Sequence, residues 1–234
     1  MKKMKIILKY LFQAPVTFSF TQKLKQNFHC LAWGEVLIYF IFLRPFKTKR
    51  ERFFFEADLR LHGQMYAAER QALFNLVIDY KPNSCFEIGT YTGAGSTFFI
   101  SAALGENGNG MLYSSEINTF LFNRAKKHYE NKLSEQAAHI KFILNENPNC
   151  FIPYLSDGRA DFVFFDGAED AKQTLDQFEF FKPYLTSGSV IAFHDWNTDK
   201  TADVKPLILA DSSWEKIDEL TPPDSVGFAS FKKV

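Results

Sequence analysis

The feature that most limits the possible folds is a short apolar run followed at once by a dense glycine turn. Residues 84–88 (SCFEI) are typical of a buried β-strand, and residues 89–96 (GTYTGAGS) contain three glycines. A helix is expected to begin at Thr97. Glycine lets a backbone approach a ligand closely, and a helix N-terminus offers unpaired N–H groups. This order predicts an α/β domain with a site for a nucleotide-like ligand.

The chain after residue 63 continues the same alternation of apolar runs and amphipathic stretches, which is typical of successive β-α units around a mostly parallel sheet. Expected strands cover residues 84–88, 110–115, 139–144, 161–165 and 190–193, and expected helices cover 66–80, 119–133 and 171–181 besides the one that begins at Thr97. Two last runs, 214–220 and 225–232, flank the turn sequence TPPD. Such a short connection favours an antiparallel C-terminal hairpin. We therefore assign residues 63–234 to one α/β domain.

Residues 1–62 are predicted to form a separate helical extension that is basic and rich in aromatic residues. Residues 1–50 hold ten basic side chains against the single acid Glu35, about +9 in formal charge, although the whole chain is neutral. Neutrality argues against a nucleic-acid-binding protein, and the eight apolar residues 36–43 fall short of the roughly 20 that span a bilayer. Two interpretations stay open for this segment: a buried helix or homodimer contact, and peripheral attachment to an anionic membrane.

The three cysteines are widely spaced and odd in number, which argues against a disulfide framework. The expected location is the reducing cytoplasm, where the protein could also be attached peripherally to the inner face of the membrane.

Two acids near the glycine turn favour one class of nucleotide-like ligand over another. The dinucleotide pattern G-x-G-x-x-G fails because Phe98 stands at its third glycine. Glu87, inside the strand, suits a ligand with a cationic amino-acid end better than a pyrophosphate. Glu116 follows Gly95 by 21 residues and ends the next strand, where a carboxylate can accept hydrogen bonds from both ribose hydroxyls. An NAD-dependent oxidoreductase is the second hypothesis.

The segment Glu87 to Gly93 (EIGTYTG) resembles the first motif of the class I S-adenosylmethionine-dependent methyltransferases. The resemblance is to O-methyltransferases of the catechol and caffeoyl-CoA type and to the group related to macrocin O-methyltransferases, and it covers about residues 64–234. It implies a Rossmann-like fold, S-adenosylmethionine as cofactor, and a hydroxyl on a sugar, glycan or secondary metabolite as acceptor. The implied cofactor contacts are Glu87, Gly89, Thr90, Tyr91, Gly93, Gly95, Ser96, Glu116 and Asp166. The loop is one residue longer than is usual in the family.

Acidic and imidazole side chains also end the two neighbouring strands 161–165 and 190–193. Asp166, His194 and Asp195 are expected to converge there, and two carboxylates with an imidazole could hold Mg²⁺ or Mn²⁺. The family resemblance implies the same metal site, with histidine where a carboxylate often stands. In the alternative, His194 is a general base that titrates near pH 6.5 when unperturbed. A third hypothesis is a membrane-associated module that keeps the fold without catalysis.

Overall fold

The computed structural model describes residues 48, 50, 51, 53, 54, 57, 65–145, 147–221 and 225–234. The chain divides into two units, residues 1–68 and residues 69–234. The helices predicted within residues 1–62, and the membrane or dimer contact proposed for residues 1–50, lie almost entirely outside the described residues. Within the described part of the chain, no helix is both long enough and apolar enough to cross a bilayer.

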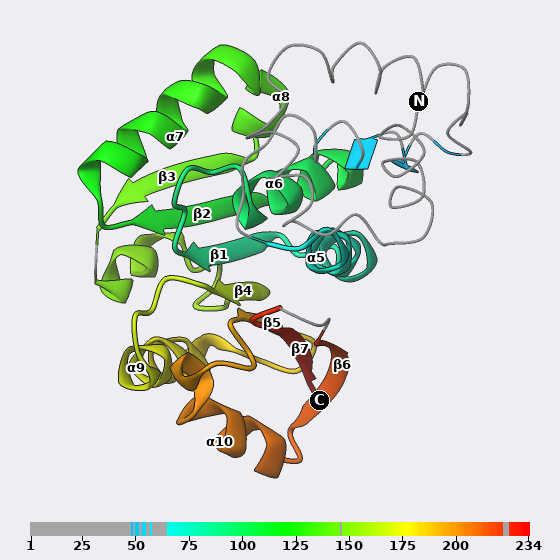
Figure 1. Cartoon of the computed structure of the whole chain (residues 1–234), viewed down its shortest axis with the longest axis vertical. Coiled ribbons are helices and arrows are strands. Elements are labelled where there is room, and N and C mark those ends of the chain that lie inside the picture. The colour runs from blue at the N-terminus through cyan, green and yellow to red at the C-terminus, as the bar shows by residue number, and fades with distance from the viewer. Residues whose placement is uncertain are drawn as a thin grey trace, which may run out of the picture. The chain divides into compact units, whose positions relative to one another are not determined.

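The second unit is built on a seven-stranded sheet in the order β3-β2-β1-β4-β5-β7-β6 (Figure 1). The strands are β1 (Ser84–Ile88), β2 (Met111–Glu116), β3 (Ile140–Leu144), β4 (Phe162–Phe165), β5 (Val190–His194), β6 (Trp214–Leu220) and β7 (Phe228–Lys233). The first five are parallel, and β7 runs antiparallel to both β5 and β6. The predicted parallel sheet with a C-terminal antiparallel hairpin is therefore confirmed.

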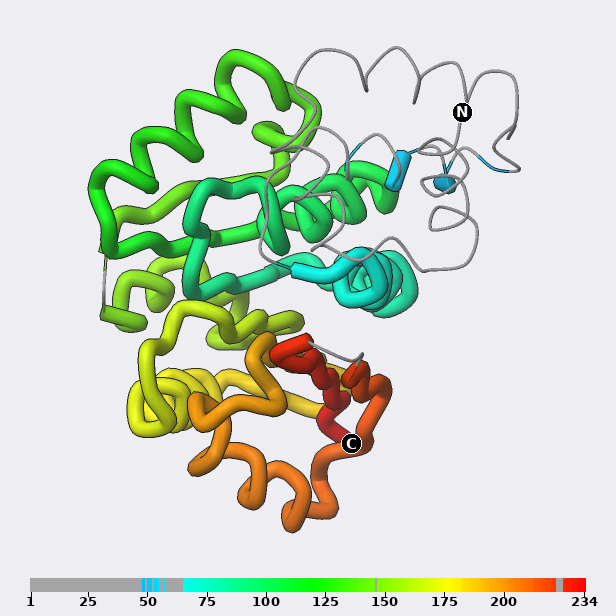
Figure 2. The backbone as a smooth tube through the Cα atoms, viewed as in Figure 1, coloured from blue at the N-terminus to red at the C-terminus, as the bar shows by residue number. Residues whose placement is uncertain are grey.

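Helices or 3₁₀ turns connect most of these strands, as the coloured tube in Figure 2 shows. They are α5 (Ala67–Tyr80), α6 (Ser96–Asn107), α7 (Thr119–Lys132), α8 (Ser134–Ala137), α9 (Ala171–Phe181) and α10 (Val204–Ala210), with 3₁₀ turns η1 (Pro148–Tyr154), η2 (Lys182–Tyr184) and η3 (Asp199–Thr201). Side chains cap the N-termini of two of the α-helices. Asn118 accepts the N–H groups of Phe120 and Leu121 in α7, and Asp170 accepts that of Gln173 in α9.

The hairpin prediction needs one correction, because β7 begins at Phe228 and not at Ser225. The preceding segment pairs with the loop after β5 instead of with β6. Trp196 N–H donates to Gly227 O at 3.1 Å, and Asn197 N–H donates to Val226 O at 2.8 Å. The backbone carbonyls of Val226 and Gly227 thus hold the loop that follows β5.

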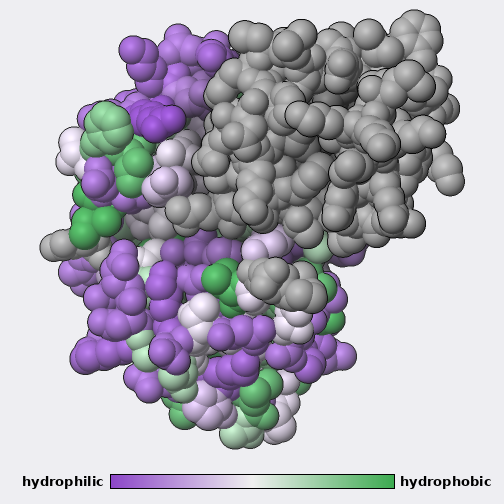
Figure 3. Space-filling model, in the orientation of Figure 1, coloured by the Kyte–Doolittle hydropathy of each residue, from purple (hydrophilic) through white to green (hydrophobic). Residues whose placement is uncertain are grey.

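One face of the sheet packs an aromatic core against η1, α9 and α10. The phenylalanine rings of β4 and β5, Phe165 and Phe193, stack with centroids 4.6 Å apart. Their cluster includes Phe86, Phe151, Val163, Phe178, Phe181, Ile191, Trp196, Val204, Ile208 and Phe231. Because side chains alternate along a strand, Glu87 and His194 point to the opposite face. Hydrophilic residues cover most of the surface coloured in Figure 3, with hydrophobic residues in separate patches.

The loops after β1 and β4 touch through two glycines. A Cβ on Gly167 would lie 2.8 Å from Ile88 Cγ2 and 2.9 Å from Gly89 N, and a Cβ on Gly89 would lie 2.8 Å from Gly167 Cα. Asp166 N–H also donates to Ile88 O at 3.1 Å. These contacts leave no room for a side chain and bring the glycine turn beside Asp166.

The glycine contact predicts opposite outcomes for two glycine-to-alanine changes. Gly167→Ala should lower the free energy of unfolding by about 1–3 kcal/mol, because the new Cβ meets backbone that must shift. Gly105→Ala in α6 is the matched control. Among the described residues its Cβ would meet only His139, at 3.6 Å, so the lower entropy of the unfolded chain should raise stability by about 0.5–1 kcal/mol. Denaturant unfolding of both variants measures this, and equal effects would contradict the packing described.

Candidate active site

The glycine turn after β1 is tied to the end of β2 by its own backbone. Gly89 N–H and Thr90 N–H both donate to Ser115 O at 3.0 Å, and Gly93 N–H closes the turn on Thr90 O at 2.9 Å. Tyr91 adopts a left-handed conformation with φ of 52°. The turn then enters α6 through Gly95 and Ser96, where the first helical N–H groups have no intrahelical acceptor. The predicted loop residues are therefore brought together on one side of the β1 terminus.

A buried tyrosine from α7 supports this turn. Tyr129 Oη donates to Gly93 O at 2.6 Å, and a Cβ on Gly93, whose φ is 71°, would lie 2.9 Å from Tyr129 Cε2. Gly93 is thus needed both for its backbone conformation and for the close approach of the ring. Sequence reasoning missed Tyr129, because an aromatic residue on a helix is normally just part of the core.

Glu116 lies at the end of β2, directly against the glycine turn. Its Oε2 accepts the N–H of Tyr91 at 2.7 Å, and its Oε1 accepts the N–H of Asn118 at 2.8 Å. Each carboxylate oxygen can accept more than one hydrogen bond, so both oxygens can also accept a hydrogen bond from a ligand. The structure places the predicted ribose acid next to the predicted loop.

Glu87 is a fully buried acid in the middle of this region. Its Oε2 accepts hydrogen bonds from Thr97 Oγ1 at 2.7 Å and from Ser114 Oγ. Within the described residues its Oε1 has no hydrogen-bond partner. Burial raises the pKa of Glu87 to about 7, although the hydroxyls of Ser114, Ser96 and Thr97 lower it. The unpartnered oxygen suits a cationic donor.

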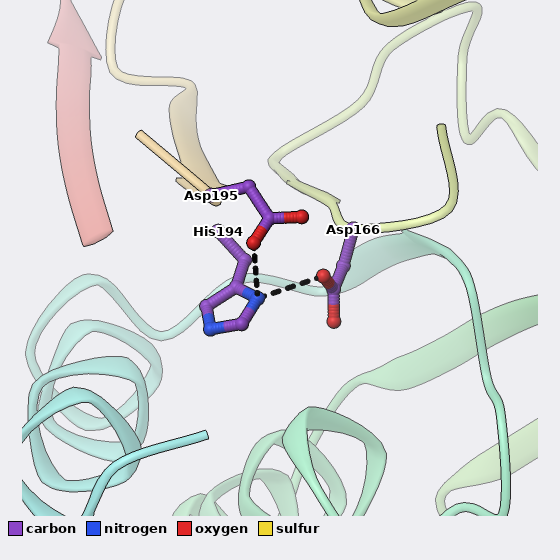
Figure 4. A group of neighbouring side chains, drawn as sticks. All are labelled: Asp166, His194 and Asp195. Atoms are coloured by element: carbon purple, nitrogen blue, oxygen red, sulfur yellow. Dashed lines mark hydrogen bonds and ion pairs between the residues drawn. The ribbon is translucent and has the colours of Figure 1, made fainter. Parts of the chain in front are cut away.

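The side chains predicted at the ends of β4 and β5 do converge, as Figure 4 shows. His194 Nδ1 lies 2.9 Å from Asp166 Oδ1 and 3.6 Å from Asp195 Oδ1. One ligand atom from each of the three residues can be chosen so that all lie within 4.8 Å of one another. Asp195 is held in a left-handed backbone conformation, and its Oδ2 forms an ion pair of 2.9 Å with Lys200 Nζ.

His194 is a cation in this environment. Burial lowers its pKa, but the Asp166 carboxylate and a second acid on its other side, Glu69, outweigh burial and raise the pKa to about 10. Burial also raises the pKa of Asp166, and His194 partly offsets that shift. The raised pKa favours the protonated form of His194 at neutral pH.

The three side chains could hold a divalent cation. One donor atom from each lies within 4.8 Å of the others, and carboxylates and imidazole are donors that Mn²⁺ and related ions accept. A cation there would displace the proton on His194 Nδ1, because a coordinating histidine must be neutral at the bound nitrogen. A small pocket opens beside the group, lined by Phe165, Ala168, Thr174, Gln177, Lys200 and Thr201.

Residues 86–196 match the sequence profile of a family described as a methyltransferase domain. This stretch of the chain is therefore similar in sequence to a methyltransferase domain. No curated protein matches the chain in sequence.

Solved structures that resemble the chain are methyltransferases. An O-methyltransferase from Bacillus cereus in complex with S-adenosylhomocysteine shares 17% identity with a TM-score of 0.60, covering 86% of this chain and 97% of that one. The O-methyltransferase TomG from Streptomyces achromogenes, in complex with S-adenosylmethionine, shares 18% at a TM-score of 0.59, covering 87% and 97%. The S-adenosylhomocysteine-bound methyltransferase PaMTH1 from Podospora anserina shares 13% at 0.57, covering 82% and 98%.

These findings confirm the predicted Rossmann-like fold and agree with the predicted resemblance to the class I S-adenosylmethionine-dependent methyltransferases. In this sheet the antiparallel strand β7 lies between β5 and β6. The dinucleotide-binding fold expected of an NAD-dependent oxidoreductase has a different strand order, 3-2-1-4-5-6. Neither that alternative nor the module without catalysis gains support.

Glu87 gives this methyltransferase domain a pH-dependent stability. Its folded pKa of about 7 lies above the ordinary 4.5, so its stabilising contribution is complete below pH 4.5 and is lost as the pH rises through 7. Between pH 5 and pH 8 the wild type should lose about 2–3 kcal/mol relative to Glu87→Gln. Denaturant unfolding at both pH values tests this, with the exposed Glu135→Gln as control. Identical pH dependence in wild type and Glu87→Gln would contradict the assigned pKa.

Proposed function

We propose that this chain transfers the methyl group of S-adenosylmethionine to a hydroxyl oxygen. The observation that carries the proposal is the convergence of Asp166, His194 and Asp195 at the same sheet edge as the glycine turn and Glu116. A cofactor-binding loop and a group able to activate an oxygen therefore lie side by side. Ligands of open α/β sheets bind at this carboxyl edge.

The cofactor contacts follow from what each polar group can accept or donate. Glu116 accepts the ribose hydroxyls with the lone pairs that Tyr91 and Asn118 leave unused. Glu87 Oε1 faces the cationic amino-acid end, whose charge favours the ionised form of this acid. The turn of Gly89 to Ser96 wraps around the methionine part. Asp166 contacts the cofactor beside the methyl group that is transferred.

Methyl transfer then needs one proton acceptor and an aligned oxygen. The acceptor hydroxyl gives its proton to the Asp166 carboxylate, and an oxygen lone pair forms the new C–O bond. The S–C bond breaks as its electron pair returns to sulfur, which leaves S-adenosylhomocysteine. The side chain of Asp166 is 22% exposed, so an acceptor hydroxyl can approach it from the surface. Positioning and charge neutralisation supply most of the rate.

His194 suits this role less well than Asp166. Its raised pKa keeps it protonated at neutral pH, and a protonated imidazole cannot take the acceptor's proton. A divalent cation held by Asp166, His194 and Asp195 would lower the pKa of the acceptor hydroxyl. Without a cation, His194 orients Asp166 through their contact of 2.9 Å.

The acceptor we propose is a small molecule or glycan with a hydroxyl on a sugar or a secondary metabolite. The support is by analogy, because TomG is an O-methyltransferase involved in tomaymycin synthesis. Fold alone does not select an acceptor. A screen of such hydroxyl compounds with labelled S-adenosylmethionine is the experiment that identifies it.

Glu116→Ala should weaken S-adenosylhomocysteine binding by about 1–3 kcal/mol, because charge-assisted hydrogen bonds to the ribose are lost. Titration calorimetry measures this, with the exposed Glu135→Ala as the control that keeps wild-type affinity. A wild type that binds NAD and not S-adenosylhomocysteine would overturn the proposed function.

Asp166→Asn should abolish turnover while S-adenosylhomocysteine still binds, because the amide cannot accept the proton or pair with His194⁺. The control is Asp176→Asn, whose exposed carboxylate pairs only with Lys172 among the contacts described for it. If a cation assists, chelation should also remove activity, and Mg²⁺ or Mn²⁺ should restore it. Full activity of metal-free enzyme would assign the activation to Asp166 alone.

A further inference from the structure

Glu69 is a buried carboxylate that the sequence did not single out. It lies in the first turn of α5 and is 0% exposed. Its Oε2 lies 3.4 Å from His194 Nε2, and its Oε1 accepts a hydrogen bond from Ser225 Oγ. A carboxylate taken out of water is destabilising unless partners compensate for the lost hydration. Its two oxygens thus join three segments that are far apart in the chain.

The contact with His194 is on the side of the ring that faces away from the two aspartates. Figure 4 shows Asp166 and Asp195 both reaching one ring nitrogen, while the other nitrogen points away from them. That second nitrogen, Nε2, is buried and has no hydrogen bond among the described residues, and Glu69 Oε2 lies 3.4 Å from it. A carboxylate at this distance favours a proton on Nε2, which leaves Nδ1 as the nitrogen available to the aspartates.

We propose that Glu69 is the positioning residue of the Asp166, His194 and Asp195 group. Its carboxylate accepts the Nε2 proton of His194 and so presents Nδ1 to a divalent cation held with the two aspartates. This deepens the proposed function and rests on it. Carboxylates behind a coordinating histidine fix its tautomer and increase its basicity, and their loss commonly weakens metal binding 10- to 100-fold.

The second contact of Glu69 links this role to the C-terminal segment. Ser225 Oγ donates to Glu69 and accepts Gly227 N–H at 2.9 Å. Gly227 O in turn accepts the N–H of Trp196, the residue after Asp195. Ser225 touches Glu69 without touching His194 in the contacts described for it. Ser225→Ala therefore removes this one contact of Glu69 and leaves the approach to the ring.

The test compares Mn²⁺ binding by the wild type, Glu69→Gln and Ser225→Ala in the full chain, measured by electron paramagnetic resonance. Glu69→Gln keeps the volume of the side chain and removes its charge. Its dissociation constant for Mn²⁺ should rise 10- to 100-fold, and that of Ser225→Ala should stay within about threefold. All three proteins should bind S-adenosylhomocysteine equally, which shows that the fold and the cofactor site are intact.

Three results would overturn the proposal. Unchanged Mn²⁺ affinity in Glu69→Gln would show that the acid does not act through His194. Equal weakening in Ser225→Ala would assign Glu69 a structural role only. A wild type that binds S-adenosylhomocysteine but not Mn²⁺ would remove the cation-directed role, while leaving the proposed cofactor and methyl transfer standing. Loss of S-adenosylhomocysteine binding by the wild type would instead count against the proposed function itself.

Discussion

The backbone contact between Gly89 and Gly167 is the constraint on which the active site depends. It holds the carboxyl ends of β1 and β4 so close that neither residue can carry a side chain. The glycine turn begins at Gly89, and Asp166, the acid that follows β4, immediately precedes Gly167. Since β5 pairs in parallel with β4, His194 and Asp195 reach the same edge. The geometry for transfer therefore follows from packing of the strand ends.

Charge balance decides what this edge can bind. Asp166, Asp195 and Glu69 surround His194, and Lys200 pairs with Asp195 at 2.9 Å. Three carboxylates thus face one imidazolium and one ammonium, which leaves an anionic excess. A divalent cation offsets such an excess better than a single proton does, although Lys200 must then share Asp195.

Much of the fold could be predicted because the strands are short apolar runs between turn residues. The bounds of Ser84–Ile88, Ala171–Phe181 and Trp214–Leu220 agree with expectation. The sequence did not predict α10, which is only seven residues long and contains a proline, or the 3₁₀ turn η1. Glu69 was also missed, since its partners are distant in the chain and an acid in a first helical turn normally interacts with the helix dipole. The chemistry-bearing residues at strand ends could be predicted, whereas those that support them could not.

The central claim is that one sheet edge holds both the cofactor and the group that activates the acceptor. A crystal structure of the protein with S-adenosylhomocysteine tests this most directly. We expect the ribose hydroxyls on the Glu116 carboxylate and the sulfur between the glycine turn and Asp166. A ligand bound elsewhere, or a ribose that makes no contact with Glu116, would contradict this account.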